Sequence, residues 1–114
     1  MLARDYSLKG KKNFEKVEKE GKMIQSDSFG IAYLKRDDEE FSHFGIIVST
    51  KVSKLSVQRN RIKRAISESI RYSLSELKPA FDVVFLAKLS IVKKPTDEIM
   101  REVRETLFSS PLKK

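Results

Sequence analysis

Apolar residues recur at helix-like spacing near the start of the chain. Phe14 and Val17 lie three residues apart and therefore share one helical face. Asn13 is a favoured N-cap and Gly21 a favoured helix stop, so we expect a short helix over residues 13–20. The polar and basic residues 1–12 that precede it are expected to form a flexible basic arm.

The spacing then changes to that of β-strands. Between residues 23 and 36, Phe29 and Ile31 alternate with smaller side chains, and the segment 44–50 is again rich in β-branched residues. Residues 37–40 are acidic and predict a surface loop. We therefore expect the two segments to form an antiparallel pair of strands joined by this loop.

The longest helix is expected in the middle of the chain. Residues 56–75 contain neither glycine nor proline, and their isoleucines recur at helical spacing. Pro79 ends this helix, the mostly apolar segment 81–87 predicts a buried strand, and Pro95 opens a last helix that reaches Leu107.

These elements predict the fold class α+β, with one domain over residues 1–114. A chain of 114 residues is large enough for one core and too small for two. We expect a single-domain α/β sandwich with a sheet of about four strands and three helices, in the order α-β-β-β-α-β-α. The absence of cysteine excludes disulfides and thiolate metal sites, and no apolar run is long enough to span a membrane. We expect a cytoplasmic protein without a membrane partner and leave its oligomeric state open.

The positive charge is concentrated in one segment. Lysine and arginine outnumber aspartate and glutamate by 24 to 16, which gives a net charge of +8. Residues 51–71 hold seven of these cations and a single acid, Glu68, which is spaced to pair with Arg64 or Arg71. This localisation predicts a binding patch for an acidic partner, of which nucleic acid is the commonest.

The predicted central helix has two opposite faces. Its isoleucines share the face expected to lie on the core, and Arg61, Arg64 and Arg71 share the face expected to point outward. Arg59 falls on the isoleucine side, so we expect it in an exposed first turn beside Asn60, where free backbone amides favour a phosphate. The predicted RNA-binding residues are Lys51, Lys54, Arg59, Asn60, Arg61, Lys63, Arg64 and Arg71.

Residues 48–71, VSTKVSKLSVQRNRIKRAISESIR, resemble the basic motif of the bacterial ribonuclease P protein. The centre of that motif, Arg-Asn-Arg followed by Lys-Arg, corresponds here to residues 59–61 and 63–64. The likeness extends to Leu8, Asn13-Phe14 and Gly21 before the motif and to Phe81-Asp82 after it.

The resemblance implies a left-handed β-α-β crossover through the basic helix, a handedness against the usual rule and known from a ribosomal protein domain. It also implies that a separate RNA subunit holds Mg²⁺ in its active site and hydrolyses precursor tRNA to leave the mature 5′ end. The protein would be a non-catalytic subunit whose partners are ribonuclease P RNA and the 5′ leader of precursor tRNA. We expect no cofactor or metal site in the protein itself, and leave open whether its carboxylates or amides help to hold a metal at the interface with the RNA.

The resemblance further places the leader in a cleft between the first helix and the sheet, where aromatic residues stack on bases. The residues expected there are Lys12, Phe14, Phe29 and Tyr33. Glu18 and Ala32 occupy positions at which the family carries further aromatic residues.

Other readings of the residues remain open beside the resemblance. A solvated basic helix face, a structural RNA-binding protein such as a ribosomal protein, and a peripheral membrane protein all share this size and charge. A protein nuclease would need acid-base groups or a metal cluster, but His43 is the only histidine and Asp82 is a lone carboxylate in an apolar strand. We expect no catalytic residue in the protein, His43 in a surface loop, and Asp82 as a pairing group.

Overall fold

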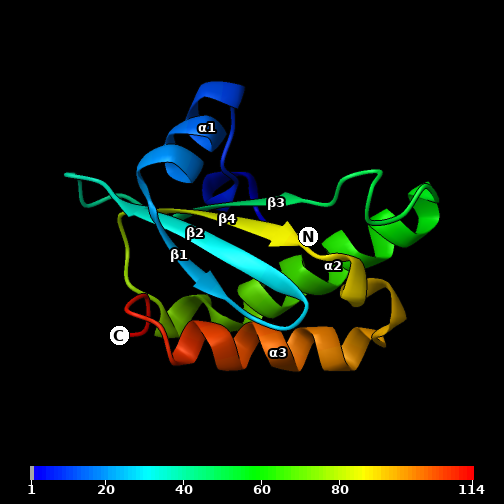
Figure 1. Ribbon diagram of the computed structural model, residues 1–114. Coiled ribbons are helices and arrows are strands. Elements are labelled where there is room, and N and C mark those ends of the chain that lie inside the picture. Colours follow the sequence, from blue (N-terminus) through cyan, green and yellow to red (C-terminus); the bar gives the residue numbers. More distant parts are fainter. Residues whose placement is uncertain (1) are drawn as a thin grey trace.

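A four-stranded mixed sheet forms the middle layer of the molecule, in the strand order β1-β2-β4-β3 (Figure 1). The computed structural model describes residues 2–114. The strands are β1 (Lys22–Gln25), β2 (Phe29–Lys35), β3 (His43–Ile47) and β4 (Phe81–Ala87). The helices are α1 (Lys11–Glu20), α2 (Ser56–Ser73) and α3 (Thr96–Phe108), with short 3-10 turns at Arg4–Tyr6 (η1), Leu74–Glu76 (η2) and Leu89–Lys93 (η3). The predicted fold class and element order are confirmed.

The predicted pairing of segments 23–36 and 44–50 is wrong. Residues 26–28 form a turn that divides the first segment into β1 and β2, which pair with each other. β4 lies between β2 and β3, antiparallel to the first and parallel to the second. The physical reason is that β4 is buried on both sides, since Phe81 to Phe85 are all buried, and such a strand belongs in the centre of a sheet.

The connection from β3 through α2 to the parallel strand β4 is the β-α-β unit that the resemblance implies. Its left-handed sense stays a prediction.

Side chains alternate between the two faces of the sheet. Phe29, Ile31 and Phe85 join the larger core under α2 and α3, whereas Ala32 and Val84 join a smaller core under α1. Figure 1 shows α1 on one side of the sheet and the other two helices on the opposite side. The molecule is therefore a three-layer arrangement with two cores.

The chain enters α1 differently from the prediction. The helix begins at Lys11, and its N-cap is Gly10, whose φ of 88° lies in the left-handed region that favours glycine. Asn13 is inside the helix and donates its side-chain amide to the Lys9 carbonyl at 2.7 Å. Asn13 is therefore not the N-cap.

Residues 2–10 of the predicted arm lie against the sheet. Leu8 is buried and donates its backbone N–H to the Phe44 carbonyl at 3.0 Å. The ring of Tyr6 stacks on Phe41, with 4.7 Å between centroids. Two apolar side chains thus anchor the segment, and its flexibility stays a prediction.

Candidate nucleic-acid interface

The two faces predicted for the central helix are present in α2. Ile62, Ile66 and Ile70 have no exposed surface, whereas Arg64 and Arg71 are exposed. Glycine and proline are absent from the helix, and its isoleucines pack on the sheet and α3. The core thereby fixes which way the basic side chains point.

Arg59 holds the loop that precedes α2. It lies in the first turn, as predicted, and its guanidinium donates to the Ser53 carbonyl at 2.8 Å. Ser53 in turn donates its hydroxyl to the Gln58 side-chain oxygen at 2.8 Å. The loop that carries Lys51 and Lys54 is therefore attached to the helix start.

Arg61 does not point outward to solvent, which corrects the prediction. It is half-buried, and its two terminal nitrogens donate to the carbonyls of Lys94 and Val92, each at 3.1 Å. These carbonyls lie at the end of η3, where they have no further helical partner. Arg61 thus ties α2 to the segment that leads into α3, and two of the predicted phosphate ligands are anchors for neighbouring loops.

The other predicted cations are less constrained. Within residues 2–114, the side chains of Lys51, Lys54, Lys63 and Arg64 make no ion pair or hydrogen bond; we call these four residues the basic cluster. Arg71 pairs with Glu68 at 2.7 Å, as its spacing predicts. That hydrogen bond lowers the pKa of Glu68 and raises the pKa of Arg71, so both stay charged at neutral pH.

The start of α2 adds backbone donors to the basic cluster. Its N-cap, Leu55, makes no side-chain capping bond, and its first turn contains no acid. Exposed Asn60 lies one turn further along the helix. Unpaired amides at a helix N-terminus favour an anion, so this end of α2 suits a phosphate.

The predicted leader cleft is not one surface. Phe29 has no exposed surface, and it packs with Phe85 in the core under α2 and α3. Tyr33 faces the same side and contacts Phe81, with 6.1 Å between ring centroids. Phe14 and exposed Lys12 lie on α1, on the opposite side of the sheet. The strand register therefore excludes Phe29 and separates Tyr33 from Phe14.

Phe14 lies on the sheet beside a glycine. A Cβ atom on Gly45 would lie 2.4 Å from the Phe14 ring, so only glycine lets the ring rest on β3. Half-buried Leu34, Ile47 and Leu86 pack, like Phe14, against the small core. Ala32, on the same side, is fully buried, and exposed Glu18 contributes an acid to α1.

Met23 was missed by the reasoning from sequence. It is 48% exposed, and it shares the α1 side of the sheet because it pairs with Ala32. Its alternation with Ile24 could have revealed this side, because neighbouring strand residues point in opposite directions.

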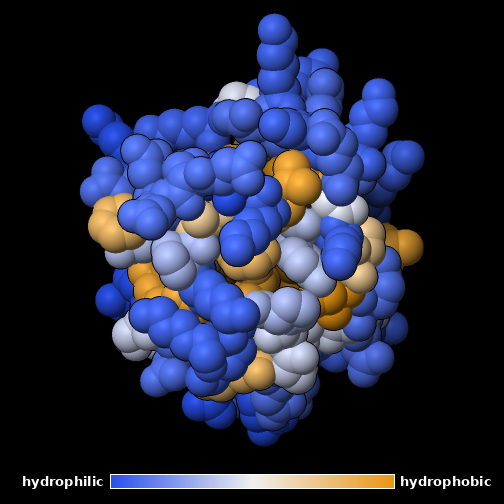
Figure 2. Space-filling model, turned by 90° about the vertical axis from the view of Figure 1, so that its left-hand side faces the viewer, coloured by the Kyte–Doolittle hydropathy of each residue, from blue (hydrophilic) through white to orange (hydrophobic). Residues whose placement is uncertain are grey.

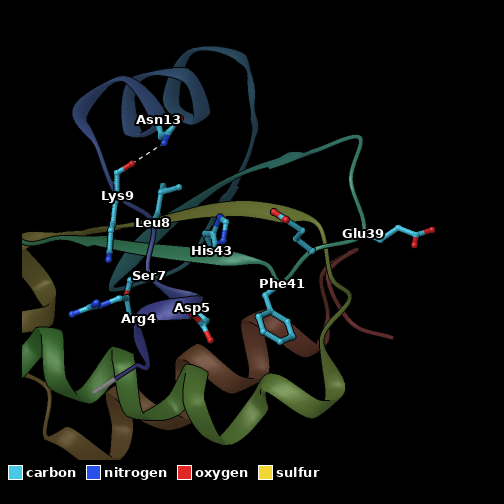
Figure 3. A pocket seen from close by; sticks show the side chains of 10 residues that line it. Arg4, Asp5, Ser7, Leu8, Lys9, Asn13, Glu39, Phe41 and His43 are labelled. Atoms are coloured by element: carbon cyan, nitrogen blue, oxygen red, sulfur yellow. Dashed lines mark hydrogen bonds between the residues drawn. The ribbon is translucent and has the colours of Figure 1, made fainter.

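A pocket of about 750 Å³ lies away from the basic cluster, between η1, the start of α1 and the loop 36–42 (Figure 3). Its lining mixes Arg4 and Lys9 with Glu39 and Glu40, so it has no single charge. His43 points into it from the start of β3, which corrects its predicted place in a surface loop.

Behind this pocket, Arg36 organises a network of charges. It forms ion pairs with Asp38 and with Asp82, which confirms Asp82 as a pairing group. His43 Nδ1 is 3.4 Å from the Asp82 carboxylate. The hydrogen bond to Asp38, above all, raises the pKa of Arg36 despite desolvation. The network holds the loop 36–42 to β4. In the described residues, no three His, Cys, Asp or Glu side chains come together as a metal site would require.

The surface around this pocket is polar. Figure 2 shows the side of the molecule that carries α1 and the loop between β2 and β3, where hydrophobic areas are small and separate. Of the helices in residues 2–114, none is long and apolar enough to cross a membrane.

Comparison with known proteins places this geometry in a family. The family model described as Ribonuclease P matches residues 2–110. The ribonuclease P protein component of Clostridioides difficile is 38% identical over 88 residues, covering 76% of this chain and 75% of the relative. That of Synechocystis is 34% identical over 108 residues, covering 95% and 86%.

Solved structures agree with the sequence comparison. The RNase P protein of Staphylococcus aureus superposes with a TM-score of 0.88 at 25% identity, over 96% of this chain and 98% of that one. The RNase P protein of Thermotoga maritima, at 22% identity and a TM-score of 0.77 over 87% and 92%, shares the fold. With its family model, its relatives and its fold in agreement, this chain belongs to the ribonuclease P protein family.

Proposed function

We propose that this chain is the non-catalytic protein subunit of ribonuclease P, and that it binds the catalytic RNA through the first half of α2. The observation that carries the proposal is the basic cluster, whose four cations have no partner within residues 2–114. Two of them lie in the loop before α2 and two in the first half of the helix, whose start has no side-chain cap. Protein cations that neutralise phosphates release the counterions condensed on the RNA, and this release supplies a large share of RNA affinity.

Arg59 and Arg61 contribute to this interface indirectly, because their guanidinium groups bind backbone carbonyls of neighbouring segments. By holding the loops before α2 and before α3, they keep Lys51, Lys54 and the exposed Lys93 at fixed positions around the helix. A fixed array of cations loses less conformational entropy when it binds than flexible side chains on free loops would.

The precursor tRNA leader binds on the α1 side of the sheet. Lys12 supplies a cation and Phe14 a half-buried ring there, with exposed Met23 on the same side. The two RNA contacts, one on α2 and one beside α1, would let one small protein bring the leader and the catalytic RNA together. Its positive charge reduces the repulsion between two polyanions.

The chemistry belongs to the RNA subunit in this proposal. The RNA subunit would hold Mg²⁺ and hydrolyse the phosphodiester bond to leave the mature 5′ end of the tRNA. The protein contributes binding and orientation, and it works in the cytoplasm where precursor tRNA is made.

Reconstitution tests the proposal. The purified chain is added to a bacterial ribonuclease P RNA at low Mg²⁺, and 5′ cleavage of a precursor tRNA is followed. We expect the chain to raise the cleavage rate by roughly tenfold or more, equivalent to about 1.4 kcal/mol of barrier. Tight RNA binding without stimulation of cleavage would instead favour a structural RNA-binding protein.

A further inference from the structure

A groove runs between α2 and α3 on the side of these helices away from the sheet. One hollow, of about 510 Å³, is lined by Arg61, Arg64 and Thr96 among others. A second, of about 380 Å³, is lined by Tyr72 and Arg104 among others. Because Met100 lines both, the two hollows form one continuous feature, which we call the α2–α3 groove.

The arginines and the glutamates of α3 lie mostly on different sides of the helix. Arg101 and Arg104 line the α2–α3 groove. Glu98, Glu102 and Glu105 line a neighbouring hollow beside the turn between β1 and β2, and Arg101 lies at the border because it lines both. Within residues 2–114, Arg101 and Arg104 make no ion pair or side-chain hydrogen bond. The groove is therefore lined by four arginines and one glutamate, Glu68, and is a positive surface.

Tyr72 is an exposed aromatic ring at the end of the groove near the C-terminus of α2. It is 68% exposed, whereas tyrosine is ordinarily intermediate in burial. The guanidinium carbon of Arg71 lies 4.5 Å from its ring centroid. This cation–π contact fixes the ring from one side and leaves most of its surface to solvent.

We propose that the α2–α3 groove binds a single-stranded segment of RNA, with one unpaired base stacked on Tyr72 and neighbouring phosphates on Arg101 and Arg104. The inference rests on the proposed RNA-binding function and extends it to α3, which the basic motif does not include. An exposed ring flanked by unpaired cations matches the way in which proteins hold single strands without reading their sequence.

A fluorescent probe can test the contact directly, because the chain contains no tryptophan. The variant Tyr72→Trp is titrated with a short single-stranded oligoribonucleotide, and the indole emission is followed. Stacking on a base should quench it in a saturable manner. The control is Phe41→Trp, whose parent side chain is 51% exposed in the loop between β2 and β3, outside the groove. Its emission should stay unchanged.

Affinity measurements complete the test. We expect Tyr72→Ala to weaken binding of the oligoribonucleotide by about 5- to 100-fold, and Tyr72→Phe to retain it, because the phenylalanine ring still stacks. The double variant Arg101→Gln/Arg104→Gln should lower the slope of log affinity against log salt by about 1.4, or 0.7 for each phosphate. A matched double variant on α1, Lys16→Gln/Lys19→Gln, should change the slope less.

The outcomes separate this inference from the proposed function. If Tyr72→Ala and the arginine pair bind RNA normally while Arg64→Gln does not, the groove inference is wrong and the RNA interface lies on α2 alone. If the unaltered chain binds no RNA, both proposals fail. Equal quenching of both tryptophan variants, or self-association lost in Tyr72→Ala, would also overturn the groove assignment.

Discussion

Arg59 and Arg61 are two residues apart in α2, yet each holds a different backbone segment. Arg59 donates to a carbonyl of the preceding loop, and Arg61 donates to two carbonyls at the end of η3. Arg64, one turn later, is exposed and has no partner in the described chain. The arginines of this short motif thus have two roles, since some stabilise the fold and others are available to bind RNA. Substitutions can separate these two roles.

We expect Arg61→Gln to destabilise the fold and Arg64→Gln to leave it intact. Loss of two charge-assisted hydrogen bonds should lower the free energy of unfolding by about 1–3 kcal/mol. An exposed arginine without partners should change it by less than about 0.5 kcal/mol. Urea denaturation measures both, and hydrogen exchange should show faster exchange around residues 88–95 in Arg61→Gln alone. Equal stability of the two variants would contradict the anchoring role.

Phe14 can be tested as a leader contact without confusing it with Tyr33. We expect Phe14→Ala to reduce the affinity for precursor tRNA by about 1–3 kcal/mol, whereas Tyr33→Ala, on the other side of the sheet, should not. Mature tRNA, which lacks the leader, is the control substrate, and its binding should be equal in both variants. Unchanged precursor binding in Phe14→Ala would remove this contact.

The contact between Phe14 and Gly45 predicts a second, structural effect. Gly45→Ala places a methyl group 2.4 Å from the Phe14 ring, so the ring must move. We expect a loss of about 1–3 kcal/mol in stability, typical of overpacking. The double variant Phe14→Leu/Gly45→Ala should recover part of this loss. Additive effects in thermal denaturation would show that the two residues do not interact.

At the scale of elements, Glu102 joins α3 to the turn between β1 and β2. Its carboxylate accepts hydrogen bonds from the Ser26 hydroxyl, the Ser28 hydroxyl and the Ser28 backbone N–H, and it pairs with Lys94 at 3.0 Å. Desolvation alone would raise its pKa, but the bonds from the two serines and Lys94 outweigh it and lower the pKa to about 2. This side chain therefore joins α3 to the turn between β1 and β2 and to the segment between η3 and α3.

This pKa predicts how stability depends on pH. The pKa of Glu102 is depressed from 4.5 in the unfolded chain to about 2 in the folded one, so its contribution is complete above pH 4.5 and is lost as the pH falls toward 2. With allowance for the 16% exposure of the side chain, that contribution is about 2–3 kcal/mol.

Glu102→Gln should remove this part of the pH dependence. Urea denaturation is measured at pH 7 and at pH 2.5, and the variant should be less stable than the parent mainly at pH 7. Glu105→Gln, an exposed glutamate on the same helix, is the matched control. A stability difference of the same size at both pH values would show that charge is not the reason.

The elements show which features can be predicted from sequence. The local spacing of apolar residues was sufficient to predict α2, α3 and β4. In α2, Ile62, Ile66 and Ile70 recur with the period of a helix, and residues 81–87 form the apolar run of a buried strand. Local spacing carries no information about strand order, since β4 enters between β2 and β3 from a distant part of the chain. Glu102 is a similar case, because its serine partners lie 74 and 76 residues away.

The place of the site on the fold could be predicted from sequence more completely than the contacts of its side chains. Charge density located the basic cluster on α2, but it did not show that Arg61 would bind carbonyls of η3, which depends on tertiary packing. The aromatic residues were chosen by type, whereas the strand register determines that Phe29 is buried on the face away from Phe14.

For the whole molecule, the net charge of +8 predicts how RNA affinity responds to salt. We expect log affinity for the catalytic RNA to fall linearly with log salt, with a slope of about 0.9 for each phosphate neutralised. Replacing Lys51 and Lys54 together by glutamine should lower that slope by about two. Filter binding at several salt concentrations measures it, with Lys16→Gln/Lys19→Gln as the control pair. An unchanged slope in the Lys51/Lys54 variant would place the phosphate contacts elsewhere.

The central position of β4 has a consequence for folding of the nascent chain during translation. Among the described residues, β3 pairs with no strand other than β4. One edge of β2 also has no partner until β4 pairs with it. While the ribosome has translated only the first 80 residues, every cation of the basic cluster has already been synthesised, but the sheet beneath α2 cannot close. Ordered RNA binding should therefore begin only when residues 81–87 leave the exit tunnel, so that an incomplete chain does not compete with finished subunits for the RNA.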